Sequence, residues 1–286
     1  MESFDAVAIG MRAAAFVGVL QATGLSLFAA THRTALAENA SPLVALARSM
    51  ALAGLALVLG HQFFEAARLA GDWSGLIDFD IQRGNWHRSP GVSALVAGAG
   101  LAIVYAGCCL QGVLSRLLTI LGALAVAGSF ALTGHTTDSS VLPLLRLLLA
   151  LHVAIVSYWL GSIVALVRLT RIARTPALYK ASTAFSASAV WLVPAILPIG
   201  VAMAIGLLPN LAALRTMYGA LLVSKVTGFA VLMALAAFNR WCVVPALDRD
   251  APVATRRFRQ MLHAEYLLIV GVLSVTAAMT SLYSWH

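Results

Sequence analysis

A few ionisable side chains in this sequence fall inside or beside long apolar stretches. His152 lies within the apolar run LLRLLLALHVAIVSYWLG, and His135 lies in the polar turn that precedes it. His61 and Glu65 are four residues apart in HQFFE, a spacing that puts both side chains on one face of a helix. An imidazole or a carboxylate costs free energy in a bilayer, so each of these residues is a candidate functional group.

The types of side chain indicate which chemistry these positions would support. Imidazole nitrogen suits copper, and the thioether sulfur of a methionine favours Cu(I). Met203 and Met279 fall in apolar runs and are therefore candidate ligands as well. A carboxylate beside an imidazole, as in HQFFE, would also suit a proton relay. The sequence contains no CxxC or HExxH motif, so the prediction of a metal site depends on residue type and depth in the membrane.

The composition requires that the apolar runs cross a membrane. The chain has 286 residues, of which 61% are hydrophobic and 10% are charged, too few polar side chains for a soluble surface. The apolar runs are continuous and rich in Ala and Leu, which predicts helices rather than barrel strands. The predicted fold is all-α, a polytopic membrane bundle of about eight transmembrane helices that forms a single domain over residues 1–286. The predicted spans are about 7–30, 43–66, 91–110, 117–133, 141–169, 181–208, 217–241 and 262–283.

The basic residues predict the orientation of the bundle. If the N-terminus lies outside, most Lys and Arg residues fall in the cytoplasmic loops, with the largest cluster in RLTRIARTPALYK. This positive-inside bias predicts that both termini face outward. The net charge of +8 therefore sets topology, and no nucleic-acid partner is expected. The start MESFDAVAIGMR lacks a basic region and predicts a retained first helix rather than a cleaved signal peptide.

This orientation gives the candidate residues an order across the membrane. His135 falls at the outer mouth, and His152 falls about 13 Å below the outer boundary, at about 1.5 Å per helical residue. Cys108, Cys109 and Glu265 fall towards the cytoplasmic side. Thiols near the inner face would suit Cu(I) as it leaves the membrane.

Each of these residues also has a structural interpretation, and both interpretations stay open. A histidine in a membrane helix can bond a neighbouring helix, and methionines and cysteines often serve only as packing. Trp159 follows His152 by two helical turns and shares its face, for which core packing is the simpler explanation. Lys225 lies deep in its span, where it either pairs with another polar group or repels a cation on its path.

Three stretches resemble the CopD/PcoD family of copper-resistance membrane proteins. TGHTT followed by LLRLLLALHVAIVSYWLGSIVAL resembles the GHAA-type turn and the H…W-x-G helix of that family. LLVSKVTGFAVLMALAAFNRWCVVPAL is similar to its lysine-containing helix, which ends in an asparagine, an arginine and a proline, here Asn239, Arg240 and Pro245. FRQMLHAEYLLIVGVLSVTAAMTSL is similar to its closing helix, with Glu265 as the glutamate.

The resemblance is weaker in the first half of the chain. There the arginine of the first helix, Arg12, and the eight-span plan agree with the family. The turn here reads GHTTD in place of GHAA, which keeps His135. The HQFFE segment matches no motif of the family, so His61 and Glu65 are predicted from the residues alone.

The resemblance implies copper handling, as Cu(I) or Cu(II), in the bacterial inner membrane, with movement from periplasm towards cytoplasm. It also implies a CopC-type periplasmic copper chaperone, expected here as a separate polypeptide. No GxxxxGK[ST] motif occurs, so ATP hydrolysis by this chain is not expected, and neither is an enzymatic role. One alternative is a membrane oxidoreductase or assembly factor that binds haem b, with His61 and His152 as axial ligands. Another is a structural or regulatory subunit without metal.

Overall fold

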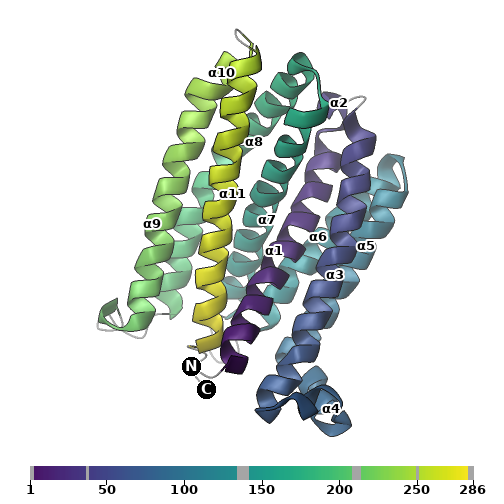
Figure 1. Ribbon diagram of the computed structural model, residues 1–286, viewed down its shortest axis with the longest axis vertical. Coiled ribbons are helices and arrows are strands. Elements are labelled where there is room, and N and C mark those ends of the chain that lie inside the picture. Colours follow the sequence, from purple (N-terminus) through teal and green to yellow (C-terminus); the bar gives the residue numbers. More distant parts are fainter. Residues whose placement is uncertain (1–2, 37–38, 134–141, 208–213, 249–250, 283–286) are drawn as a thin grey trace.

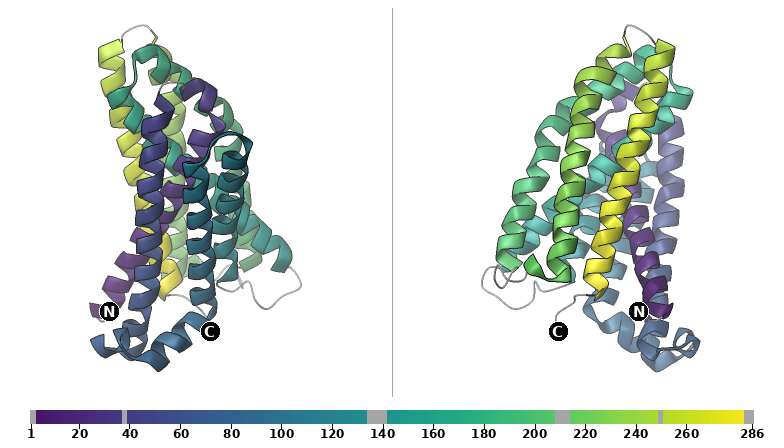
Figure 2. Two further views of the ribbon diagram at one scale, coloured as in Figure 1. Left: turned by 90° about the vertical axis from the view of Figure 1, so that its right-hand side faces the viewer. Right: turned by 60° about the vertical axis from the view of Figure 1, so that its left-hand side comes forward.

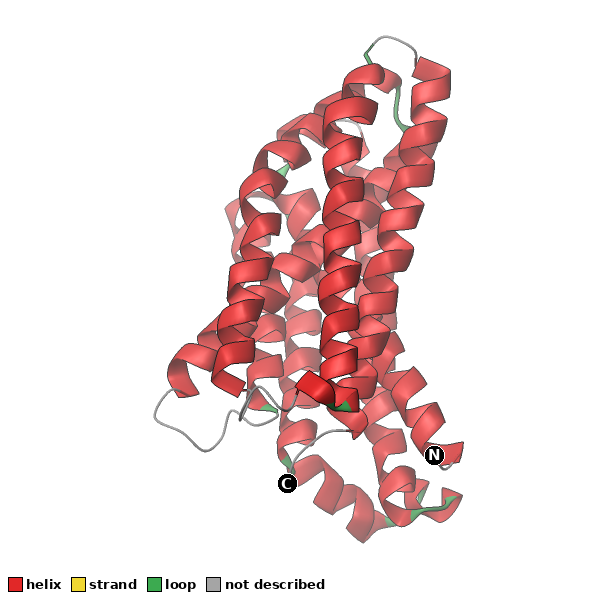
Figure 3. Ribbon diagram, turned by 90° about the vertical axis from the view of Figure 1, so that its left-hand side faces the viewer, coloured by secondary structure: helices red, strands yellow, loops and turns green. Residues whose placement is uncertain are grey.

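The computed structural model describes residues 3–36, 39–133, 142–207, 214–248 and 251–282, which are helical almost throughout and include no strand (Figure 3). Eight of its helices are long and apolar enough to cross a membrane (Figure 1). They are α1 (Ser3–Thr31), α3 (Ala40–Ala70), α5 (Ser89–Cys109), α6 (Gly112–Ser129), α7 (Leu142–Ile172), α8 (Thr175–Leu207), α9 (Met217–Phe238) and α11 (Ala251–Leu282). The predicted all-α, eight-span membrane bundle is confirmed, and the chain is a multi-pass membrane protein.

Short helices complete the described part of the chain. They are α2 (Arg33–Leu36), the 3-10 helices η2 (Trp73–Leu76) and η3 (Phe130–Leu132), α4 (Phe79–His87), the π-helix η5 (Asn239–Val243) and α10 (Val244–Ala246). The start of α1, the end of α11 and α4 lie at one end of the bundle, which we call the terminal end, and α2 and α10 lie at the opposite end (Figures 1 and 2). An even number of membrane crossings requires this arrangement. The charge distribution of the loops predicts that the terminal end faces the periplasm.

The helices extend beyond the apolar runs that predict them. The last span is predicted to begin at about residue 262, whereas α11 begins at Ala251. The additional turns contain the basic segment RRFRQ, and Phe258 within it is fully buried. Hydropathy detects only the part of a helix that is apolar on all sides, so an amphipathic extension at its end escapes detection.

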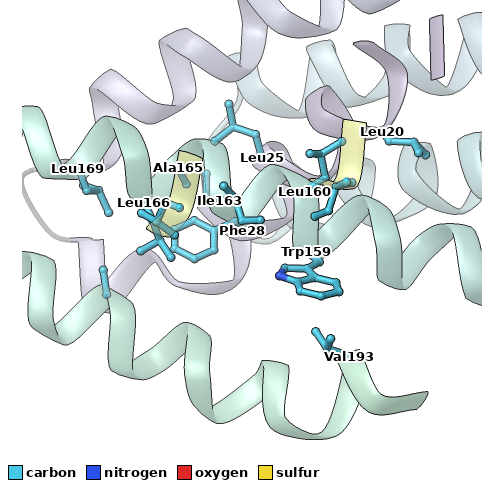
Figure 4. Close-up of a cluster of buried hydrophobic side chains, with 14 of the residues drawn as sticks. Leu20, Leu25, Phe28, Trp159, Leu160, Ile163, Ala165, Leu166, Leu169 and Val193 are labelled. Carbon is cyan, nitrogen blue, oxygen red and sulfur yellow. The ribbon is translucent and has the colours of Figure 1, made fainter. Parts of the chain in front are cut away.

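Helix α1 is the centre of the bundle. It packs against α3, α6, α7 and α11, and 67% of its most apolar window is buried, whereas the corresponding share for α9 is 6%. Its side chains and those of α7 interlock in the main apolar core, where Phe28, Leu160 and Ile163 are fully buried (Figure 4). Helix α9 therefore presents most of its surface to lipid, and α1 and α7 hold the positions of the polar groups described below.

Glycines set how closely α1 and α7 approach each other. A Cβ atom added to Gly24 would lie 1.7 Å from the carbonyl oxygen of Ser157, and one added to Gly161 would lie 2.0 Å from the backbone nitrogen of Leu25. The Ser157 hydroxyl donates a hydrogen bond of 2.8 Å to the carbonyl oxygen of Leu20 across the same contact. Small residues commonly allow such backbone contact between membrane helices.

Candidate functional site

Arg12 joins three helices near the terminal end of the bundle. Its Nε donates to Nε2 of His61 at 3.4 Å, and its Nη2 contacts Oε1 of Glu65, also at 3.4 Å. Its Nη1 donates to the carbonyl oxygen of Thr280 at 3.0 Å. Arg12 therefore links α1 to α3 and to α11. We call Arg12, His61, Glu65 and Arg68 the Arg12 cluster.

Arg68 adds a second positive charge to this cluster. Its Nη2 lies 2.9 Å from Oε1 of Glu65, and its Nη1 lies 3.7 Å from Asp5. His61 and Glu65 are buried, with 9% and 6% of their surfaces exposed, and Oε2 of Glu65 has no hydrogen-bond partner among the described residues. The structure brings His61 and Glu65 together on one face of α3, as their spacing predicts. A copper ion at this place would meet two guanidinium groups, so in this conformation the cluster is arranged for ion pairing.

Substitution of Glu65 by glutamine should destabilise the protein. The change leaves Arg12 and Arg68 without their shared carboxylate, in a place where the Glu65 side chain is only 8% exposed. Breaking a buried ion pair costs about 3–5 kcal/mol, and the partial exposure of the two arginines reduces the expected loss to about 2 kcal/mol. Thermal unfolding of the purified protein in detergent measures this loss of stability.

Asp5→Asn is the matched control for this prediction. The Arg68–Asp5 pair is more exposed, at 34% and 37% for the two side chains, so its loss should change the free energy of unfolding by less than about 1 kcal/mol. Equal unfolding temperatures for Glu65→Gln and the wild type would contradict the assignment of Glu65 as the carboxylate that holds the cluster together.

His152 has a different environment from His61. It is half-buried in the terminal half of α7, and its Nδ1 is buried without a hydrogen-bond partner in the described part of the chain. Its ring faces α8 near Gly200, where an added Cβ would lie 3.9 Å from the ring, and the charge of Lys225 on α9 acts on it. The backbone of Ile196 on α8 also forms a hydrogen bond with the ring, and the nitrogen without a partner is available to a metal ion in the tautomer that leaves it unprotonated. A positive charge on Lys225 would oppose the approach of that ion.

His61 and Glu65 do not join His152 in one cluster. Within the described ranges, no group of three or more His, Cys, Asp or Glu side chains could hold a metal ion, so His61 and Glu65 are separate from His152. Met203 is half-buried on α8 against the main core, and Met279 is buried on α11. His135 lies outside the described residues.

Glu265 is the second buried glutamate of the bundle. It lies on α11 with 2% of its surface exposed, and Nδ2 of Asn239 donates to its Oε1 at 3.0 Å. The indole N–H of Trp159 is a further hydrogen-bond donor to Glu265. Trp159 therefore packs in the apolar core, as expected (Figure 4), and also supports a buried carboxyl group. The sequence does not predict that α7, η5 and α11 meet at this carboxyl group.

The cysteines do not form a metal site with one another. All three are free thiols. Cys108 is half-buried, with its Sγ 3.6 Å from the Ser26 hydroxyl, and Cys109 and Cys242 are exposed. Cys108 and Cys109 end α5 at the opposite end of the bundle, as the predicted topology requires.

Two family descriptions match this chain and together cover most of it. Residues 3–141 match "Copper resistance protein D-like, N-terminal domain", and residues 179–279 match "Copper resistance protein D". The chain belongs to the CopD copper-resistance family. The Arg12 cluster falls in the first match, Lys225, Asn239 and Glu265 fall in the second, and His152 and Trp159 on α7 lie between the two. No curated protein and no solved structure matches the chain.

Proposed function

We propose that this CopD-family protein transports or delivers copper in the bacterial inner membrane, moving the ion from periplasm towards cytoplasm without acting as an enzyme. The observation that carries the proposal is the unpartnered imidazole nitrogen of His152 inside the membrane-spanning part of a copper-resistance protein. Copper is the cargo. An unprotonated imidazole nitrogen without a hydrogen-bond partner is available to bind it.

The proposed path begins at the terminal end, which the charge distribution predicts to be periplasmic. His135 is the predicted capture residue at the mouth, and His152 is the first ligand within the membrane. Met203 and Met279 are the candidate thioether ligands, which would favour Cu(I) over Cu(II). Lys225 lies near His152 and sets an electrostatic barrier on the path. A separate CopC-type chaperone would deliver copper at the periplasmic end.

In this proposal, His61 and Glu65 act as copper ligands only if their bonds to arginine are released. Both are bonded to Arg12, and Glu65 is bonded to Arg68 as well. They bind copper only in a conformation from which the two arginines have moved away. In the described conformation the Arg12 cluster holds α1, α3 and α11 together. At the opposite end, the exposed thiols of Cys109 and Cys242 are available to Cu(I) as it leaves.

Copper uptake into proteoliposomes tests the proposal. Vesicles that contain the purified protein and an enclosed Cu(I) indicator should take up copper faster than empty vesicles. In the double variant His135→Ala, His152→Ala, uptake should fall to the rate of empty vesicles, because both imidazoles of the proposed path are lost. His87→Ala is the control, because His87 is exposed on α4 outside the membrane. Equal uptake by the double variant and the wild type would refute the proposed path.

An absorption spectrum separates copper from the haem alternative. A protein that binds haem b is coloured as purified and shows a Soret band, whereas a Cu(I) protein is colourless. In the described conformation Nε2 of His61 accepts a hydrogen bond from Arg12, and nothing in the described part of the chain favours haem. A structural or regulatory subunit would show neither metal nor colour.

A further inference from the structure

Glu265 lines a cavity in the half of the bundle nearer the opposite end. The cavity measures about 130 Å³ and lies between α7, α8, α9, η5 and α11, with Trp159, Ser186, Met233, Asn239 and Arg240 also in its wall. This volume is large enough for water molecules, and polar atoms are present to bond them. The copper path proposed above does not use this place.

Glu265 has no cationic partner in the described part of the chain. Among the residues that line the cavity, Arg240 is the other charged side chain, and its guanidinium donates to the carbonyl oxygen of Ser186. The walls from α7, α8 and α9 contribute Trp159, two serines and Met233, none of which carries a charge. Glu65, by contrast, contacts two arginines. A buried carboxyl group without a cationic partner avoids the cost of burying its charge by binding a proton.

Asn239 identifies where that proton would be held. Its Nδ2 donates to Oε1 of Glu265, while its own Oδ1 is buried and has no donor among the described residues. Asn239 is 7% exposed, so water outside the protein does not satisfy this oxygen. A carboxylic acid and a primary amide can form a cyclic pair in which the amide N–H and the acid O–H each donate to the other group. A proton on Glu265 supplies the donor that Oδ1 lacks.

We propose that Glu265 is an intramembrane proton-binding site, in which the protonated carboxyl group pairs with Asn239 and exchanges its proton through the adjoining cavity. The ligand is H⁺, and the proton resides on a carboxyl oxygen of Glu265. A π-helix begins at Asn239, whose amide bonds Glu265 on α11, and such local widening of a helix is frequent at functional sites. The proposal concerns proton binding and does not require that the protein carries copper.

Infrared spectroscopy of the metal-free protein in lipid nanodiscs tests this proposal. The wild-type spectrum minus that of Glu265→Gln should contain the C=O stretching band of a protonated carboxyl group at neutral pH. The band should disappear when the pH is raised. Glutamine has the shape of the neutral acid, so the variant is expected to fold. Glu65 is present in both proteins, so its contribution cancels in the difference.

A second variant tests the role of the amide. In Asn239→Leu the acid loses its hydrogen-bond partner, so the C=O band should move to higher wavenumber while it remains present. Absence of the band from the difference spectrum at every pH at which the protein is folded would overturn the proposal. An unchanged band position in Asn239→Leu would overturn the acid–amide pair. Neither result bears on copper uptake, so failure here is distinct from failure of the transport proposal.

Discussion

His152→Ala is expected to weaken copper binding by at least about tenfold, which corresponds to about 1.4 kcal/mol. The imidazole of His152 is the described side chain that combines a place within a membrane span with a buried, unpartnered nitrogen. Nδ1 has no hydrogen-bond partner in the described part of the chain, so in its unprotonated tautomer it offers a bound ion a ligand. Titration of the purified protein with Cu(I) in competition with a chelator of known affinity measures the change.

His263→Ala is the matched control for this titration. His263 lies on α11, is exposed, and bonds the carbonyl oxygen of Arg259 in its own helix. Its removal should leave the affinity for copper unchanged. His152→Gln keeps a polar side chain of similar length and separates loss of the ligand from loss of packing. A wild-type affinity in both His152 variants would contradict the assignment of His152 as a copper ligand.

The sequence predicts the membrane fold because one physical constraint dominates it. Backbone groups in hydrocarbon must bond within their own helix, so each long apolar run reads as one span. All eight spans are recovered on this basis. The sequence does not predict where α11 starts, because the turns before residue 262 carry basic residues on one side and bury Phe258 on the other. Hydropathy alone does not recognise such an amphipathic turn.

The sequence predicts only the part of the candidate site that depends on the spacing of residues within one helix. The interval of four residues puts His61 and Glu65 on one face of α3, and the structure agrees. The hydrogen bonds from Arg12 to His61 and Glu65 depend on how α1 packs against α3. No local sequence pattern predicts that packing. The same holds for Glu265, whose donors come from α7 and from the end of α9. Side chains distant in sequence meet through tertiary packing, and the periodicity of one sequence does not predict which helices pack together.

The two buried glutamates illustrate how surroundings assign different roles to one residue type. Glu65 meets two guanidinium groups, and these ion pairs hold neighbouring helices together. Glu265 meets an amide, an indole and a water-sized cavity, and no cationic group among the described residues bonds it. Charge is therefore neutralised by arginine at the terminal end and, in our proposal, by a proton in the opposite half. The ion path at His152 lies on the same face of α7 as Trp159, which contacts Glu265.

The close contact between α1 and α7 holds these groups in place, so its disruption should have a large effect on stability. In Gly24→Ala the new methyl group would lie 1.7 Å from the carbonyl oxygen of Ser157 and 2.5 Å from its carbonyl carbon. Both clashing atoms belong to the backbone, so the helices must separate, which also breaks the bond from Ser157 to the carbonyl oxygen of Leu20. We expect a loss of about 3 kcal/mol or more, at the upper end of the range for overpacking.

Thermal unfolding in detergent measures this loss, and Gly10→Ala is its matched control on the same helix. A Cβ atom at Gly10 meets nothing within 4 Å, so that substitution should leave stability unchanged or raise it by about 0.5 kcal/mol through the better helix propensity of alanine. Gly161→Ala tests the contact from the side of α7, where the new methyl group would lie 2.0 Å from the backbone nitrogen of Leu25. If both Gly24→Ala and Gly161→Ala unfold at the wild-type temperature, the two helices do not meet backbone to backbone. The positions of His152 and Trp159 relative to α1, which depend on that contact, would then also be wrong.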